Sequence, residues 1–351
     1  MSAPPHSKPR SPRTRFFALA SAARSISPSA AYPFRGFAPA RPMSFFSRRL
    51  IFFFAVIAVA ISGLPAFAGE IFRDIEYGRA SGETLLLDAH VPPTPGPHPI
   101  AILVHGGGWS RGDKSGSDKP GDGADITPWF APLTAANFTW FSINYRQAPA
   151  HRWPAALEDV QTAIRWVKAH AADYRGDPSR IALFGHSAGG HLVCLAAALA
   201  DDSTRVQAVV GFAPVTDFET DVAHRGGQLS TSLQALFALP AAPTPESLAL
   251  LRAASPLTHI KPGLPPFLLL HGEADKTVRL EQSLAFQQKL RAAGVRCDLI
   301  TLPGAPHGLL TWPQFLPDYP DRMISWLREI LAPATAHHDT FDAPFGFLEP
   351  S

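Results

Sequence analysis

The chain has 351 residues, of which 46% are hydrophobic and 17% charged, a composition that predicts a globular protein of one large or two small domains. The formal net charge is only +2, and the arginines concentrate before residue 50, so the rest of the chain is mildly acidic and a nucleic-acid partner is not expected. Two cysteines, Cys194 and Cys297, exclude a disulfide framework and leave at most one bridge; both are expected to be small buried hydrophobic residues.

The first 68 residues contain the pattern of an export signal. Residues 50–64, LIFFFAVIAVAISGL, form an apolar run that follows Arg48 and Arg49 and precedes PAFAGE. Because this is the order of a charged region, an apolar region and a cleavage site, we predict a signal peptide over residues 43–68 with cleavage near Ala68. The mature protein would then be periplasmic or secreted. A bilayer span needs about twenty apolar residues, so a permanent membrane span is the less favoured alternative. The twin-arginine and general export routes both stay open.

The two ends of the chain are expected to lie outside the folded domain. Residues 1–42 are rich in Pro, Arg, Ser and Ala, and a signal peptide normally begins within a few residues of its charges. We therefore hypothesise that translation starts at Met43 and that residues 1–42 are a mis-assigned extension; a native precursor peptide from upstream of Met43 would refute this. Residues 336–351 show no periodicity and are expected to form an irregular tail.

Residues 69–335 alternate strand-like and helix-like segments. This alternation predicts one α/β domain with a mostly parallel sheet of about eight strands and helices on both faces. The expected strands are an antiparallel hairpin over residues 71–78 and 84–92, followed by buried strands within residues 99–105, 138–145, 180–185, 206–214, 266–272 and 296–303. Helices are expected within residues 153–174, 191–200 and 279–294, the last ending on Gly294.

Two segments interrupt the alternation, residues 110–137 and 218–262, and each follows a predicted strand. Ligands of open α/β sheets bind beyond the carboxyl ends of the strands. We therefore interpret these segments as pocket walls or a small lid, lined by Trp109, Trp129 and Phe130, with solvent-exposed decoration as the alternative. Three aspartates in the first segment lack the spacing of a calcium loop, so no metal site is predicted there: Asp118, Asp122 and Asp125.

Residues 180–192, RIALFGHSAGGHL, run a predicted buried strand directly into a helix with one serine at the corner. So abrupt a turn drives the corner residue toward positive φ and needs small neighbours two positions before and after it, which Gly185 and Gly189 provide. We expect Ser187 to project its hydroxyl beside the unpaired N–H groups that begin the helix. This is the G-x-S-x-G arrangement of a nucleophilic serine, with an ordinary glycine-rich turn as the alternative.

A serine nucleophile also needs donors for the oxyanion that its attack creates. The stretch AILVHGGGW ends a predicted strand with three glycines, whose N–H groups can turn toward an anion. We predict an oxyanion hole made by Gly107, Gly108 and the N–H of Ala188, with a flexible tight turn as the alternative. His105 is interpreted as a structural residue that pins the loop.

A general base and an acid that orients it follow the last two predicted strands. Asp275 lies in PFLLLHGEADKTV, with Glu273 as the alternative acid, and His307 lies in the loop of CDLITLPGAPHGL. Serine, aspartate and histidine thus occur in that chain order, each after a separate strand, so we predict a catalytic triad of Ser187, Asp275 and His307.

With these residues the chain resembles an α/β-hydrolase-fold esterase of the family with an HGGGW oxyanion loop. That family includes the hormone-sensitive-lipase-type carboxylesterases and the branch of acetyl and feruloyl esterases. The stretches that carry the resemblance, between about Ile71 and Leu331, are HGGGWSRGDK, INYRQAPAHRWPAALEDV, GHSAGGHL, LLLHGEADKTV and PGAPHGL. GHSAGG in place of GDSAGG favours the acetyl and feruloyl branch.

The resemblance implies a serine carboxylic-ester hydrolase that needs no cofactor and acts on small acyl esters. Predicted export favours acetyl or feruloyl esters of carbohydrates as a hypothesis for the substrate. Candidates for the substrate pocket are Trp109, Trp153 and Trp312. Tyr145 and Arg146 are either substrate ligands or, as we favour, a buttress of the site. The competing functions are a peptidase or amidase with the same triad, and a non-catalytic binding protein with an esterase fold.

Overall fold

The structure is a computed structural model that describes residues 69–116 and 126–333. The predicted signal peptide, the extension before Met43, the irregular tail and the three aspartates at 118, 122 and 125 lie outside the described residues. Within the two described ranges, no helix is both long and apolar enough to cross a membrane.

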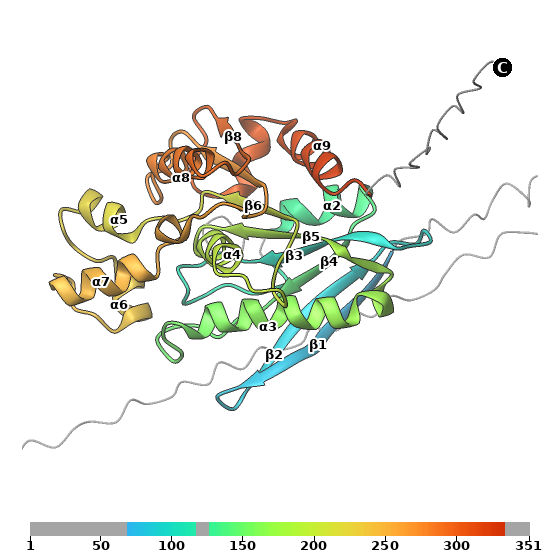
Figure 1. Ribbon diagram of the computed structural model, residues 1–351, viewed down its shortest axis with the longest axis horizontal. Helices are drawn as coiled ribbons and strands as arrows, with labels where there is room; N and C mark the ends of the chain where they lie inside the picture. Colours follow the sequence, from blue (N-terminus) through green and yellow to red (C-terminus); the bar gives the residue numbers. More distant parts are fainter. Residues whose placement is uncertain (1–68, 117–125, 334–351) are drawn as a thin grey trace, which may run out of the picture. The chain divides into compact units, whose positions relative to one another are not determined.

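The described residues form an eight-stranded sheet in the order β1-β2-β4-β3-β5-β6-β7-β8 (Figure 1). β1 pairs antiparallel with β2, as expected of the hairpin, and β2 pairs antiparallel with β4, whereas all other neighbouring strands are parallel. The mostly parallel sheet of about eight strands is therefore confirmed. The strands are β1 (Glu70–Ala80), β2 (Glu83–Val91), β3 (His98–Val104), β4 (Thr139–Ile143), β5 (Gly176–His186), β6 (Ala208–Phe212), β7 (Phe267–Gly272) and β8 (Cys297–Leu302).

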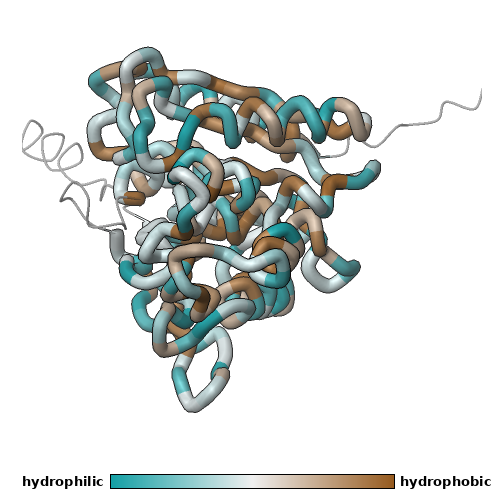
Figure 2. The backbone as a smooth tube through the Cα atoms, turned by 90° about the vertical axis from the view of Figure 1, so that its left-hand side faces the viewer, coloured by the Kyte–Doolittle hydropathy of each residue, from teal (hydrophilic) through white to brown (hydrophobic). Residues whose placement is uncertain are grey.

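Helices cover both faces of this sheet, as predicted. One core cluster joins the sheet to α3 (Ala155–His170), α4 (Ala188–Ala198) and α8 (Glu281–Ala292). A second cluster, on the other face, joins it to α2 (Thr127–Ala135) and α9 (Tyr319–Ile330). Hydrophobic and hydrophilic residues alternate along helices at the outside of the molecule, as expected when only one side of a helix packs on the sheet (Figure 2), whereas every residue of α4 is buried. Two short 3-10 helices complete these layers, η1 (Ala171–Tyr174) and η3 (Leu309–Gln314).

The structure corrects the interpretation of residues 110–137 as a wall or lid of the catalytic pocket. This segment contains α2, which lies against the sheet, and Trp129 is fully buried with its ring 4.7 Å from that of Phe212. Phe130 stacks on Trp140 at 4.7 Å and so also belongs to this layer. The described part of the segment thus places a helix on the sheet between β3 and β4. Pro132, which lies inside the helix, hides it in the sequence because proline normally disfavours a helix interior.

Residues 218–262, by contrast, form a helical insertion between β6 and β7, which we call the lid segment. They contain α5 (Phe218–His224), α6 (Thr231–Phe237), α7 (Pro245–Ala253) and η2 (Pro256–His259), and the three α-helices gather at the left of Figure 1. Each α-helix begins where a polar side chain accepts a hydrogen bond from a first-turn N–H, and these caps are Asp217, Ser230 and Thr244.

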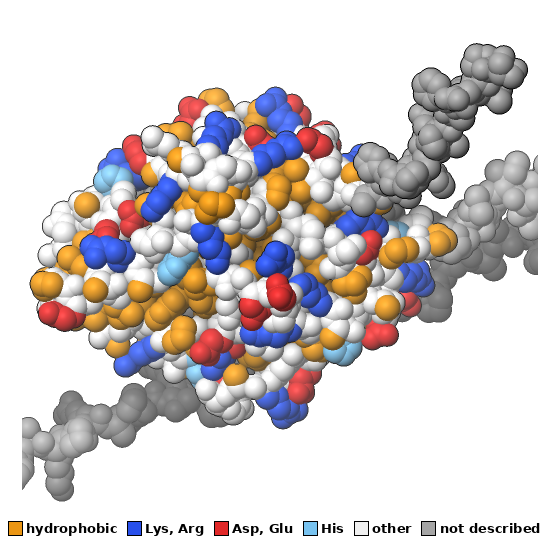
Figure 3. Space-filling model, viewed as in Figure 1, with side chains coloured by type: hydrophobic (Ala, Val, Ile, Leu, Met, Phe, Trp, Pro, Cys, Tyr) orange, Lys and Arg blue, Asp and Glu red, His pale blue; other side chains and the backbone are white. Residues whose placement is uncertain are grey.

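The charge and the cysteines agree with the sequence analysis. Acidic and basic side chains are interspersed on the face seen in Figure 3, as expected of a chain with a small net charge. Cys194 and Cys297 are both free and buried. Burial raises the pKa of the Cys297 thiol to about 12, so it is protonated and unreactive at neutral pH.

Candidate active site

The strand order places the HGGGW loop and Ser187 at the same point of the sheet. β3 has β4 on one side and β5 on the other, and at such a reversal the loops that follow the strands diverge to leave a crevice. The HGGGW loop follows β3, and Ser187 follows β5. The segments that carry them are in close contact: a Cβ atom added to Gly189 would lie 2.2 Å from the carbonyl oxygen of Val104 and 2.5 Å from that of His105. Only glycine fits at this position.

Ser187 has the strained corner geometry predicted from its neighbours. Its backbone angles are φ 55° and ψ −116°, and α4 begins at the next residue, Ala188. A Cβ atom on Gly185 would lie 2.2 Å from the carbonyl oxygen of Gly189, so both small neighbours are required. Ser187 is only partly buried, which leaves its hydroxyl accessible at the start of a helix.

The three residues of the predicted triad lie within hydrogen-bonding distance of one another. Ser187 Oγ is 2.9 Å from His307 Nε2, and His307 Nδ1 is 2.6 Å from Asp275 Oδ2. The alternative acid, Glu273, is exposed, whereas the Asp275 carboxylate is fully buried. The structure therefore brings Asp275, and not Glu273, to the histidine.

The hydrogen bonds around Asp275 fix the tautomer of the histidine. Burial on its own raises the pKa of the Asp275 carboxyl, but His271, His307 and the N–H of Val278 outweigh it and hold that pKa below its usual value. Asp275 is thus ionised and can only accept, so His307 carries its proton on Nδ1. Nε2 of His307 is left to accept the hydroxyl proton of Ser187.

The loops that carry the acid and the base are held by buried side chains that the sequence analysis did not single out. His271 is fully buried, donates from Nε2 to the carbonyl of Val278 at 2.9 Å, and lies 3.5 Å from Asp275 Oδ2. His186, next to the nucleophile, lies 3.0 Å through Nε2 from the carbonyl oxygen of His307. The sequence gives one hint of this role for His271 and His186, which is that they stand within the motif stretches LLLHG and GHS.

Trp312 corrects a sequence prediction. It was a candidate for the substrate pocket, but its side chain is fully buried in the second core cluster. Its indole N–H donates to the carbonyl of Pro306 at 2.7 Å and so anchors the loop that carries His307. Because it is fully buried, Trp312 cannot line a substrate pocket. The reason is that η3, which carries Trp312, packs into this core cluster, and no local pattern in the sequence indicates that contact.

The HGGGW loop has an unusual backbone that suits an anion site. Gly107, Gly108 and Trp109 all have positive φ, at 109°, 60° and 57°. Among the described residues, no hydrogen-bond acceptor is found for the N–H groups of Gly107, Gly108 or Ala188. N–H groups left free in this way can converge on an oxyanion.

His105 and Tyr145 hold the base of that loop. The two rings stack at 4.5 Å, and the Tyr145 hydroxyl lies 3.1 Å from the carbonyl oxygen of His105. His105 is fully buried, and burial lowers its pKa to about 4, so it is neutral and donates from Nδ1 to the carbonyl of Gly106 at 2.7 Å. This placement agrees with a structural role for His105.

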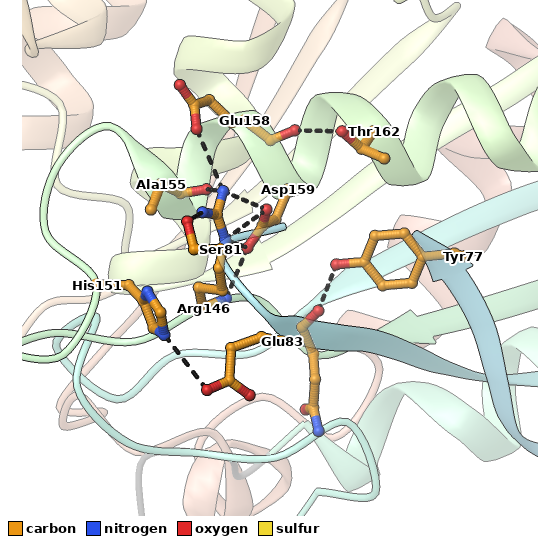
Figure 4. Close-up of polar contacts among 10 residues, drawn as sticks. Tyr77, Ser81, Glu83, Arg146, His151, Ala155, Glu158, Asp159 and Thr162 are labelled. Atoms are coloured by element: carbon orange, nitrogen blue, oxygen red, sulfur yellow. Dashed lines mark hydrogen bonds and ion pairs between the residues drawn. The ribbon is translucent and has the colours of Figure 1, made fainter. Parts of the chain in front are cut away.

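Arg146 lies in a buried ionic cluster with the start of α3 (Figure 4). Its guanidinium forms hydrogen bonds of 2.8 to 3.0 Å to the carboxylate of Asp159, which is 1% exposed, and also reaches Glu158 and Ser81. With its donors used inside the protein, Arg146 has little left for a ligand. The geometry favours the buttress over the ligand alternative for Arg146 and, through the loop contacts given above, for Tyr145.

Of the remaining pocket candidates, only Trp153 is accessible to a ligand. Trp109 is 4% exposed and packs with its ring 5.6 Å from that of Phe218, whereas Trp153, just before α3, is partly exposed. A cavity of about 360 Å³ is bordered by His90, Phe130 and Trp140, away from the triad. The described residues contain no group of three or more histidine, cysteine or acidic side chains that could hold a metal ion.

Comparison with known proteins gives a consistent picture. Residues 87–290 match the BD-FAE family. The chain is 35% identical over 228 residues to the probable carboxylic ester hydrolase LipM of Mycobacterium tuberculosis, covering 62% of this chain and 50% of LipM. It is 34% identical over 225 residues to esterase LipC of the same organism, covering 60% of this chain and 53% of LipC. The chain thus spans about half the length of the curated relatives it matches.

Solved structures show the same fold over most of the domain. A truncated form of a carbohydrate esterase from gut microbiota superposes with a TM-score of 0.62 at 25% identity, covering 75% of this chain and 97% of that one. An acetyl ester-xyloside bifunctional hydrolase from Caldicellulosiruptor lactoaceticus gives a TM-score of 0.60 at 26% identity, covering 77% of this chain and 98% of that one.

Proposed function

The chain belongs to the BD-FAE family of α/β-hydrolase carboxylesterases, and from this membership we propose that it is a serine carboxylic-ester hydrolase. The observation that carries the proposal is the chain of hydrogen bonds from Ser187 through His307 to the buried Asp275. This chain ends beside N–H groups that have no acceptor in the described structure.

In the proposed reaction, Ser187 Oγ attacks the ester carbonyl carbon while its proton passes to His307 Nε2. Gly107, Gly108 and Ala188 hold the resulting oxyanion through their N–H groups, and Asp275 stabilises the charged imidazole. The C–O bond to the alcohol breaks as His307 returns the proton to the leaving oxygen. Water then attacks the acyl-enzyme by the same path and releases the acid. The reaction needs no cofactor.

The proposed substrates are small acyl esters, with acetyl or feruloyl esters of carbohydrates first among them. Two observations support this choice: solved structures of similar fold include a carbohydrate esterase and an acetyl ester hydrolase, and the partly exposed Trp153 offers a ring on which a sugar can stack. Export, proposed from residues 43–68, would give the protein access to such polymers.

The test compares hydrolysis of p-nitrophenyl acetate, butyrate and octanoate with release from acetylated xylan and methyl ferulate. Protein starting at Gly69 is measured beside Ser187→Ala and Asp275→Asn, with Glu273→Gln as the matched control. We expect Ser187→Ala to lose activity and Asp275→Asn to lower kcat about 10⁴-fold, because both substitutions alter the triad. Glu273→Gln leaves the triad intact and should keep full activity.

Each other outcome counts against part of the proposal. Activity confined to aliphatic esters contradicts the carbohydrate substrate, and activity on peptides or amides but not esters favours the peptidase alternative. Inertness toward all these substrates favours a binding protein.

A further inference from the structure

A cluster of ring side chains lies directly behind the HGGGW loop and joins it to the lid segment. Trp109 comes from the loop, His191 from α4, Phe218 from α5, Phe237 from α6, and Trp153 from the turn just before α3. Neighbouring ring centroids are 4.8 to 5.8 Å apart. All of these side chains except Trp153 are buried.

The polar atoms inside this cluster form one directed chain. His191 Nε2 is 2.9 Å from the carbonyl oxygen of Ala254, and a carbonyl can only accept, so Nε2 carries a proton. Burial lowers the pKa of His191 to about 4, which keeps the ring neutral and leaves a lone pair on Nδ1. That atom accepts the indole N–H of Trp109 at 3.2 Å. The bonds therefore run from Trp109 to His191 to Ala254.

This chain ends on a strained residue of the oxyanion loop. Trp109 has φ 57°, a conformation that non-glycine residues rarely adopt and that persists only when the surroundings enforce it. Two hydrogen bonds enforce it here: the indole bond to His191, and the bond from the N–H of Ala148 to the Trp109 carbonyl at 2.8 Å. Trp109 directly follows Gly107 and Gly108, so holding it in place fixes one end of the short segment that carries their N–H groups.

We infer that His191 is a positioning residue for the oxyanion hole: by accepting the Trp109 indole N–H, it holds the loop in the conformation that aims the N–H groups of Gly107 and Gly108. The inference rests on the proposed ester hydrolysis. His191 does not touch the substrate, and its contribution is realised when negative charge develops on the carbonyl oxygen.

Two substitutions of similar size separate this role from ordinary core packing. In His191→Asn, the side-chain oxygen can take the place of Nδ1, which keeps an acceptor for the indole. In His191→Gln, the amide nitrogen can take the place of Nε2, which keeps the bond to Ala254 but leaves the indole N–H unpaired. Trp109→Phe removes the indole donor while keeping a ring.

The experiment measures kcat and KM for p-nitrophenyl acetate, and Ki for a trifluoromethyl ketone that forms a tetrahedral adduct with the serine. His191→Gln and Trp109→Phe should each lower kcat about tenfold or more, with KM within twofold and Ki rising by the same factor as kcat falls. His191→Asn should recover kcat to within about threefold of the parent. The double variant Trp109→Phe/His191→Gln should lose no more than either single variant.

Three results would overturn the inference. They are equal losses of kcat in His191→Asn and His191→Gln, an effect on KM alone, and additive losses of kcat in the double variant. If His191→Gln does not fold, Trp109→Phe decides, because an unchanged kcat there also refutes it. Ser187→Ala keeps the two proposals apart: activity that survives in that variant contradicts the proposed function, whereas activity lost in it but unchanged in His191→Gln contradicts only the positioning role.

Discussion

Asp159 is expected to stabilise the fold and not to bind substrate, and its replacement tests the buttress behind the active site. The Asp159 carboxylate is 1% exposed and accepts three guanidinium contacts and the backbone N–H of Arg146, the latter at 2.8 Å. Arg146 is only 9% exposed. In Asp159→Asn its guanidinium keeps a single charged partner, the Glu158 carboxylate, whose side chain is 57% exposed.

The magnitude follows from this loss of compensation. Removing one partner of a buried ion pair costs about 3–5 kcal/mol, and because Glu158 remains we expect the lower end, about 3 kcal/mol. For a domain of this size that lowers Tm by roughly 6–12 °C. The double variant Arg146→Met/Asp159→Leu removes the charge as well and should recover at least half of the lost stability.

Urea unfolding followed by tryptophan fluorescence measures both variants, with kcat and KM determined below the unfolding transition. Equal destabilisation of the single and double variants would contradict the ion-pair reasoning. Unchanged stability together with a large rise in KM would show instead that this cluster binds the substrate.

Gly108→Ala should lower kcat by up to about a hundredfold, because its Cβ would lie 2.6 Å from the Ser232 hydroxyl and 3.2 Å from the Ser232 Cβ, so that either the loop or Ser232 must shift; Gly82→Ala, also at positive φ but with nothing within 4 Å, is the matched control and should keep full activity. Trp312→Phe should lower kcat severalfold with little change in KM, since the loop of the base loses its anchor at Pro306, and a change in KM alone would contradict this. Stability should fall on acidification. Burial lowers the pKa values of His105 and His191 from 6.5 to about 4. Below pH 6.5 the unfolded chain therefore binds protons that the folded chain does not. For each of the two residues, the free energy of unfolding should fall by about 1.4 kcal/mol per pH unit down to pH 4. Urea midpoints that stay constant between pH 7 and pH 5 would refute this.

The local sequence was sufficient to predict the parts of the protein that depend on short-range patterns. The apolar runs predicted the strands because a parallel sheet buries both of its faces. The corner at Ser187 was predictable because a strand that turns at once into a helix admits only glycine at positions 185 and 189. The triad was predictable because serine, aspartate and histidine occur in that chain order and each follows a separate predicted strand.

Packing between distant segments decided what the sequence left open or led us to misinterpret. Trp129 and Trp312 are core residues because the second face of the sheet had to be covered, and no local pattern shows which face a tryptophan will meet. Asp275 rather than Glu273 reaches the histidine because the loops after β7 and β8 meet, 32 residues apart in the chain. The bond from Trp109 to His191 joins residues 82 positions apart. Such pairings depend on the tertiary fold, since hydrogen bonds act only between atoms that the fold has already brought within about 3 Å.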